Sequence, residues 1–163
     1  MVTIRLAVPG DIEAINEIYN HYVLTSTCTF HLDPVTFDER QEWLNEHSER
    51  YSVTVAELDG VVVGWASLSP HRPRPAYAGT VESSVYIQFD HHRKGIGREL
   101  MVDLISRAKN AGFHTLVAGA EASQTGSIRL HEALGFTHIA RYKEVGYKFD
   151  QWLDTVFLQL MLD

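Results

Sequence analysis

A basic stretch that begins at Arg93, Arg-Lys-Gly-Ile-Gly-Arg, joins a strand pattern to a helix pattern. Arg93, Lys94 and Arg98 supply positive charge, while Gly95 and Gly97 leave room for backbone N–H groups to approach a ligand closely. The first turn of a helix also carries unpaired N–H donors and the positive end of the helix dipole. The stretch predicts a cradle for an anion, above all a pyrophosphate. The competing interpretation is a helix start whose glycines only permit tight packing.

Two common phosphate-binding motifs do not fit this stretch. A dinucleotide fingerprint would require glycine at position 100, where the chain has Leu100. The Gly-Lys-Ser or Gly-Lys-Thr triplet of a P-loop does not occur. What remains is a basic residue followed by x-x-Gly-x-Gly directly after a strand.

Two side chains could carry protons. Glu82 lies in the middle of an alternating strand pattern, an expensive place for a carboxylate, so it is a candidate general base. The competing interpretation is a solvated or ion-paired residue on the sheet.

His131 titrates near neutrality and could act as an acid or a base. Its apolar neighbours Ile128, Leu130 and Leu134 equally allow a buried core histidine.

The segment His-Arg-Pro-Arg-Pro at 71–75 forms a stiff basic loop. Guanidinium groups bind carboxylates well, so Arg72 and Arg74, with Pro73 between them, could hold an acidic substrate. A solvated surface loop is the alternative. We expect no metal site, because none of the nine histidines has helical His-x-x-x-His spacing with a carboxylate. The one cysteine, Cys28, allows no disulfide within the chain, and we interpret it as a small buried apolar residue rather than an acyl carrier.

The composition is that of a globular protein. The 163 residues, 45% of them apolar and 21% charged, predict one domain over residues 1–163. The net charge of −7 argues against general binding to nucleic acid or to an anionic membrane. The chain shows no signal peptide and no long apolar run, so we expect a cytoplasmic protein.

The pattern of apolar residues predicts the elements that hold these side chains. Strands are expected at 2–7, 53–58, 61–68, 80–88, 116–120, 137–145 and 155–162, and an aromatic turn at 147–152. A first helix is expected to open at Pro9-Gly10-Asp11, with an apolar stripe from Ile12 through Tyr22. Further helices are expected from the capping box Thr36/Glu39 to about Arg50, from Ile96 to about Gly112, and at 127–134. Asp59-Gly60 predicts a hairpin. This order predicts an α/β fold with a mixed, mostly antiparallel central sheet, helices on both faces and a β-α-β crossover.

The segment His92-Arg93-Lys94-Gly95-Ile96-Gly97 resembles the acetyl-CoA motif of the GNAT superfamily of N-acetyltransferases, although that family has Arg or Gln where this chain has His92. Gln124-Thr125-Gly126-Ser127 and the stretch from Ser127 to Phe136 resemble a second GNAT signature, with His131 in place of its usual tyrosine. The resemblance implies acetyl-CoA as cosubstrate, Glu82 as base and His131 as acid or proton relay. It also implies that the cofactor lies against one set of residues: Val85, Tyr86, Ile87, Arg93, Lys94, Gly95, Ile96, Gly97, Arg98, Gln124 and Ser127.

A closer resemblance is to the phosphinothricin and methionine sulfoximine acetyltransferases. It rests on three separated segments: Thr-Val-Glu-Ser-Ser-Val-Tyr at 80–86, His-Glu-Ala-Leu-Gly at 131–135, and Val-Gly-Tyr-Lys-Phe at 145–149 with Trp152 and Asp154. The resemblance implies acetylation of the α-amino group of a small amino acid or analogue, and a homodimer. It implies a substrate site at Arg72, Pro73, Arg74, Glu82, Ser83 and Ser84. A GNAT enzyme for another amine (a polyamine, an aminoglycoside or a protein N-terminus) and an acyl-CoA-binding sensor without turnover stay open as alternatives.

Overall fold

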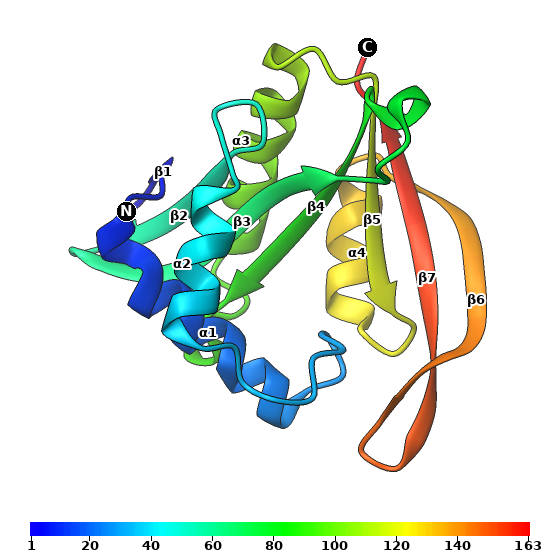
Figure 1. Ribbon diagram of the computed structural model, residues 1–163, viewed down its shortest axis with the longest axis horizontal. Coiled ribbons are helices and arrows are strands. Elements are labelled where there is room, and N and C mark those ends of the chain that lie inside the picture. Colours follow the sequence, from blue (N-terminus) through cyan, green and yellow to red (C-terminus); the bar gives the residue numbers. More distant parts are fainter.

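Seven strands form one sheet in the order β1-β2-β3-β4-β5-β7-β6 in the computed structural model, which describes residues 1–163 (Figure 1). The strands are β1 (Val2–Leu6), β2 (Val53–Leu58), β3 (Val61–Pro70), β4 (Thr80–Ile87), β5 (Thr115–Glu121), β6 (Thr137–Lys148) and β7 (Gln151–Met161). The α-helices are α1 (Ile12–Thr25), α2 (Phe37–Asn45), α3 (Ile96–Asn110) and α4 (Thr125–Ala133). All neighbouring strands are antiparallel except β4 and β5, which α3 connects. The predicted fold class is confirmed.

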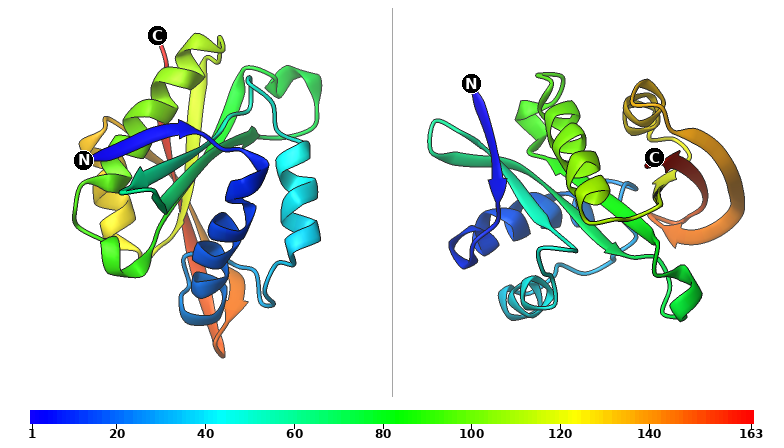
Figure 2. Two further views of the ribbon diagram at one scale, coloured as in Figure 1. Left: turned by 90° about the vertical axis from the view of Figure 1, so that its left-hand side faces the viewer. Right: turned by 90° about the horizontal axis from the view of Figure 1, so that it is seen from above.

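Helices cover both faces of the sheet (Figure 2). The apolar stripe of α1 and residues of α2 pack on one face around Val53, Val55 and Trp65. Helix α3 and the apolar side of α4 pack on the other face in a larger core that includes Leu100 and Leu158. Burial of these apolar surfaces provides the main driving force for the fold. No helix has the length and apolarity needed to cross a membrane.

Local signals placed two of the connections correctly. Asp59 and Gly60 have φ values of 50° and 80°, as a two-residue hairpin between β2 and β3 requires. Thr36 and Glu39 form the predicted capping box, in which each side chain accepts a hydrogen bond from the backbone N–H of the other. The prediction that this helix runs to about Arg50 is wrong, since α2 ends at Asn45. The chain turns there, and Arg50 donates to the carbonyl of Ala111 at 2.7 Å.

The last two strands are longer than predicted. The expected aromatic turn at 147–152 is wrong, because only Phe149 and Asp150 lie between β6 and β7. Both have positive φ values, 52° and 58°, which is the geometry of a tight two-residue hairpin. The rings of Tyr147 and Trp152 instead pair across the two strands with centroids 5.0 Å apart.

Strands β4 and β5 separate after a short stretch of pairing. Thr80, Val81 and Glu82 pair with residues of β5, and no later residue of β4 does. Figure 1 shows the two strands diverging from that point, while β5 stays paired with β7. The edge of β4 over residues 83–87 that faces away from β3 is therefore left without a strand partner.

Candidate active site

A cavity of about 570 Å³ fills the wedge between the diverging strands. Its walls come from the unpaired edge of β4, the start of α3, the end of β5 and the start of α4. Of the residues expected to contact acetyl-CoA, all except Lys94 line it: Val85, Tyr86, Ile87, Arg93, Gly95, Ile96, Gly97, Arg98, Gln124 and Ser127. Ser83, Ser84 and His131 line it as well. The fold thus gathers residues from two separate sequence motifs around one space.

The N-terminus of α3 opens into this cavity. Gly95 stands at the N-cap with φ of 80°, a left-handed conformation that favours glycine, and no side chain caps the helix. The N–H groups of the first turn are therefore available to an anion, beside Arg93 and Arg98. Gly97 has a packing role too, because a Cβ there would lie 3.3 Å from the side chain of Leu130 in α4. The packing interpretation therefore applies to Gly97, and the anion cradle stays a prediction.

His131 is buried, with 4% of its surface exposed, and it lines the cavity. Its Nδ1 lies 2.7 Å from the carbonyl oxygen of Ser127, and a carbonyl can only accept, so Nδ1 carries the proton. The neutral ring therefore has its lone pair on Nε2. Burial lowers the pKa of His131, against a smaller opposing effect of the bond to Ser127. The ring is held in place by an edge contact with Phe136, at 4.9 Å between centroids.

Glu82 lies at the closed end of the wedge, where it is the last residue of β4 that pairs with β5. It is not among the residues that line the cavity. Its Oε1 lies 3.1 Å from Nδ1 of His71, and about 40% of its side chain is exposed. The next residue, Ser83, does line the cavity, and its buried hydroxyl has no hydrogen-bond partner in the chain. A buried hydroxyl without a partner is costly, so Ser83 is suited to bind a ligand group.

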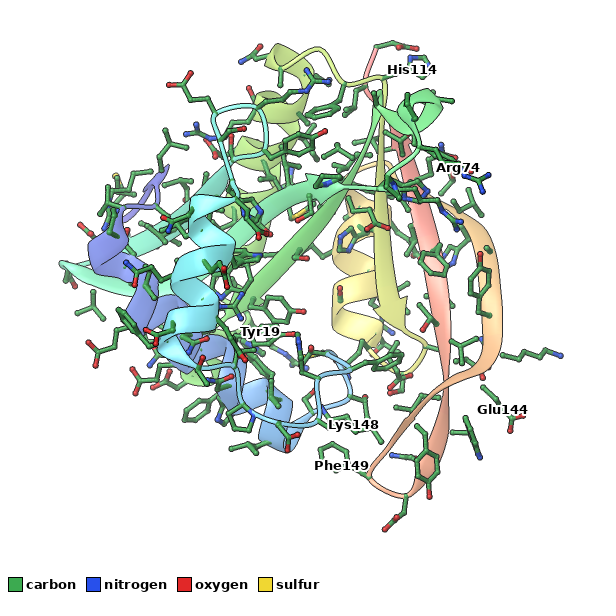
Figure 3. The ribbon with its side chains drawn as sticks, in the orientation of Figure 1. Tyr19, Arg74, His114, Glu144, Lys148 and Phe149 are labelled. Atoms are coloured by element: carbon green, nitrogen blue, oxygen red, sulfur yellow. The ribbon has the colours of Figure 1, made fainter.

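The basic loop that was expected to hold a substrate carboxylate lies outside the cavity. Arg72, Pro73 and Arg74 are exposed, and the guanidinium of Arg72 stands 5.8 Å from the centre of the Tyr77 ring. The loop leads into β4 at the closed end of the wedge, on the side of Glu82. Figure 3 shows Arg74 in the upper part of the view, far from Lys148 and Phe149 in its lower part.

His92, the departure from the expected motif, braces the end of β4. Its Nε2 lies 2.6 Å from the hydroxyl of Tyr22 and 3.2 Å from the carbonyl oxygen of Ile87. The Tyr22 hydroxyl also binds that carbonyl. Because a carbonyl only accepts, Tyr22 donates to Ile87 and accepts from His92. His92 thus lines the cavity and is also held by hydrogen bonds to Tyr22 and Ile87.

Sequence reasoning missed a carboxylate on the cavity wall. Glu121 ends β5, is 6% exposed, and receives hydrogen bonds from Thr27 and Ser123. Burial raises its pKa, but these hydrogen bonds outweigh burial and hold the pKa below the usual value. Little in the sequence indicated that Glu121 would be held at the cavity, because its partner Thr27 stands 94 residues before it in the chain.

Two further observations concern the cysteine and the possible metal ligands. Cys28 lines the cavity, but burial raises the pKa of its thiol, so it is a poor nucleophile at neutral pH. No group of three or more histidine, cysteine, aspartate or glutamate side chains in the chain could hold a metal ion.

Comparison with known proteins agrees with this geometry. Residues 4–157 match the model of the acetyltransferase (GNAT) domain. An L-methionine sulfoximine/L-methionine sulfone acetyltransferase of Salmonella typhimurium is 44% identical over 163 residues, which cover 99% of this chain and 95% of the relative. A phosphinothricin N-acetyltransferase of Streptomyces viridochromogenes is 40% identical, with 97% of this chain and 86% of the relative covered. An acetyltransferase of Salmonella typhimurium solved with acetyl-CoA superposes with a TM-score of 0.96 at 44% identity, over 99% and 94% of the two chains.

Proposed function

The chain belongs to the GNAT acetyltransferase family and is an acetyl-CoA-dependent acyltransferase, and we propose that it acetylates the α-amino group of a small amino acid or analogue. The acceptor would belong to the class of phosphinothricin, methionine sulfoximine or methionine sulfone. These compounds appear in the names of relatives that are 40–44% identical to this chain. We take residues 1–163 as the single catalytic domain.

The observation that carries the proposal is the wedge between β4 and β5. Its open end offers the uncapped N-terminus of α3 with Arg93 and Arg98, which suits a pyrophosphate. Its side offers the unpaired edge of β4 over residues 83–87, which suits the amide groups of a pantetheine arm. The thioester would then lie deeper in the wedge, near Ser83 and His131, and the acceptor would bind on the side of Glu82, where the wedge narrows.

When bound, acetyl-CoA supplies an activated acyl group and a thiolate leaving group. An α-ammonium with a pKa near 8 is only about a tenth deprotonated at pH 7, so a modest base suffices. Glu82 lies outside the cavity wall, so we propose that it removes the amine proton through a water molecule. His131 lines the cavity and its Nε2 is free to accept, so we propose that it receives the second proton that the amine nitrogen loses as the C–N bond forms, and passes this proton to the thiolate sulfur as the C–S bond breaks.

The acceptor carboxylate would meet the basic loop at the same end as Glu82. Arg72 and Arg74 are exposed and have no ion pair with an acidic residue, so their guanidinium groups are available. Ser83 and Ser84 line the adjacent cavity wall and could bind the amino acid backbone.

We also propose a homodimer that uses the β6–β7 hairpin. Large apolar side chains are exposed along these strands: Ile139, Tyr142, Val145, Tyr147, Phe149 and Trp152 are each about half exposed or more. Such a band is unusual on a monomer and is typical of a contact surface. A cytoplasmic location, where acetyl-CoA is available, is part of the same proposal.

The test is thiol release from acetyl-CoA on addition of methionine sulfone, methionine sulfoximine or phosphinothricin. We expect turnover with the free acids. Arg72→Gln should lower kcat/KM about ten- to a hundredfold for the acid and hardly at all for its amide, since one charge-assisted contact is lost. Polyamine and aminoglycoside acceptors form the comparison set. If the protein binds CoA tightly but releases no thiol with any amine, the result would contradict the proposed enzyme and favour an acyl-CoA-binding sensor.

A further inference from the structure

Glu121 is a buried carboxylate on the cavity wall that the acid–base scheme does not use. Three donors from two residues bind it: the hydroxyls of Thr27 and Ser123, and the backbone N–H of Ser123 at 2.6 Å. A carboxylate held by several donors stays ionised, in agreement with the direction of its pKa. An ionised carboxylate can only accept hydrogen bonds.

Because Glu121 can only accept, it determines the direction of the hydrogen bonds made by Thr27 and Gln124. The hydroxyl of Thr27 has a single hydrogen and must donate it to Glu121. Its oxygen can then only accept from Gln124, whose Nε2 lies 3.0 Å away. A carboxamide could otherwise turn either way, because its nitrogen and oxygen ends have the same shape. Glu121 thus determines, through Thr27, that the NH2 group of Gln124 faces inward.

The oxygen end of Gln124 is consequently left for a ligand. Gln124 lines the cavity and occupies the N-cap position of α4. A side-chain oxygen at an N-cap commonly accepts from the helix, yet Gln124 makes no such bond. Its Oε1 accepts no hydrogen bond from within the chain, so it remains available on the side of the cavity.

We propose that Glu121 and Thr27 are positioning residues that orient Gln124, so that Gln124 Oε1 accepts an amide N–H from the pantetheine arm of acetyl-CoA. The proposal rests on the placement of acetyl-CoA in the wedge given above. It predicts that Glu121 and Thr27 contribute to cofactor affinity without a direct contact between the cofactor and the Glu121 carboxylate or the Thr27 hydroxyl.

The loop that carries Thr27 is anchored on both sides. Lys148 is buried and donates to the carbonyls of Ser26 at 2.7 Å and Thr29 at 2.8 Å, which flank the threonine. Figure 3 shows Lys148 pointing from the β6–β7 hairpin toward this loop. The position of Thr27 is therefore fixed by the hairpin. Its hydroxyl alone links Glu121 to Gln124 and so determines the orientation of the Gln124 carboxamide.

The experiment measures CoA affinity by calorimetry in Thr27→Val, which keeps the shape of threonine and removes the hydroxyl. We expect the dissociation constant to rise about three- to tenfold, the range for one neutral hydrogen bond. Thr27→Ser should restore the parent value. Adenosine 3′,5′-bisphosphate, which lacks the pantetheine arm, should bind both variants like the parent. Thr25→Val is the matched control, since the Thr25 hydroxyl donates only to the carbonyl of His21.

A double-mutant comparison separates positioning from general disturbance. In a Gln124→Ala background, Thr27→Val and Glu121→Gln should each have no further effect on CoA affinity, because both act through the missing carboxamide. An unchanged CoA affinity in Thr27→Val, an equal loss for the bisphosphate, or an undiminished loss in the Gln124→Ala background would overturn the proposal. If a folded Gly97→Val variant also binds CoA like the parent, the placement of the cofactor itself is wrong.

Discussion

Replacing His131 by phenylalanine tests the proposed proton relay most directly. The substitution keeps a ring of similar shape in the edge contact with Phe136. It removes the bond from Nδ1 to the Ser127 carbonyl, which is worth about 1 kcal/mol, so the fold should tolerate the change. What it removes from the cavity is the lone pair of Nε2.

The expected size of the effect follows from the protonation state. Because burial lowers the pKa of His131, the neutral form of the ring is favoured over the protonated form near neutral pH. A residue that must begin as an acid would therefore be mostly in the wrong form, whereas one that first receives a proton is ready to act. Loss of such a group typically lowers the rate about 10²–10⁴-fold, and we expect the lower end for a relay that water can partly replace.

The assay is the pH profile of kcat under saturating acetyl-CoA and acceptor. In the parent, kcat should rise as the pH passes upward through the lowered pKa of His131 and then level off. His131→Phe should lower the plateau and abolish that limb, while His131→Tyr should keep much of the activity through its hydroxyl. His138→Phe, at an exposed histidine bound to Glu132, is the matched control. A His131→Phe enzyme with the parent kcat over the whole range would make His131 a core histidine and refute the relay.

Three further outcomes are expected. Glu82→Gln should reduce kcat about 10²-fold or more, with CoA affinity by calorimetry unchanged; an undiminished kcat would exclude Glu82 as the base. Gly146→Ala should lower the melting temperature, because a Cβ there would lie 2.4 Å from the ring of Phe30, and a stability equal to the parent would show that the ring moves freely. Lys148→Met should cost about 1–3 kcal/mol in denaturant unfolding, since the carbonyls of Ser26 and Thr29 lose their donor; no change would mean that water replaces it.

The sequence was sufficient wherever structure depends on neighbours in the chain. Asp59-Gly60 forms a hairpin because both residues accept positive φ, and Thr36 with Glu39 starts a helix because each side chain reaches the other's backbone. The glycines at 95 and 97 marked the N-terminus of α3 for the same local reason. The end of α2 and the β6–β7 turn were misplaced. Beyond Asn45 the chain is no longer helical and Arg50 donates to the distant carbonyl of Ala111, while Tyr147 and Trp152 belong to paired strands and not to a turn.

The tertiary structure alone decided where β4 and β5 part, because pairing between strands that are distant in the sequence depends on how the rest of the fold positions them. That divergence creates the cavity, brings His131 to its wall and leaves Glu82 beside it, bound to His71. It also sets Glu121 against Thr27, 94 residues earlier in the chain. No periodicity signals such a pair, since a hydrogen bond across the wedge needs only proximity that the whole fold provides. The sequence therefore identified the chemistry of the cofactor motif, whereas the fold determined which carboxylate meets the cavity.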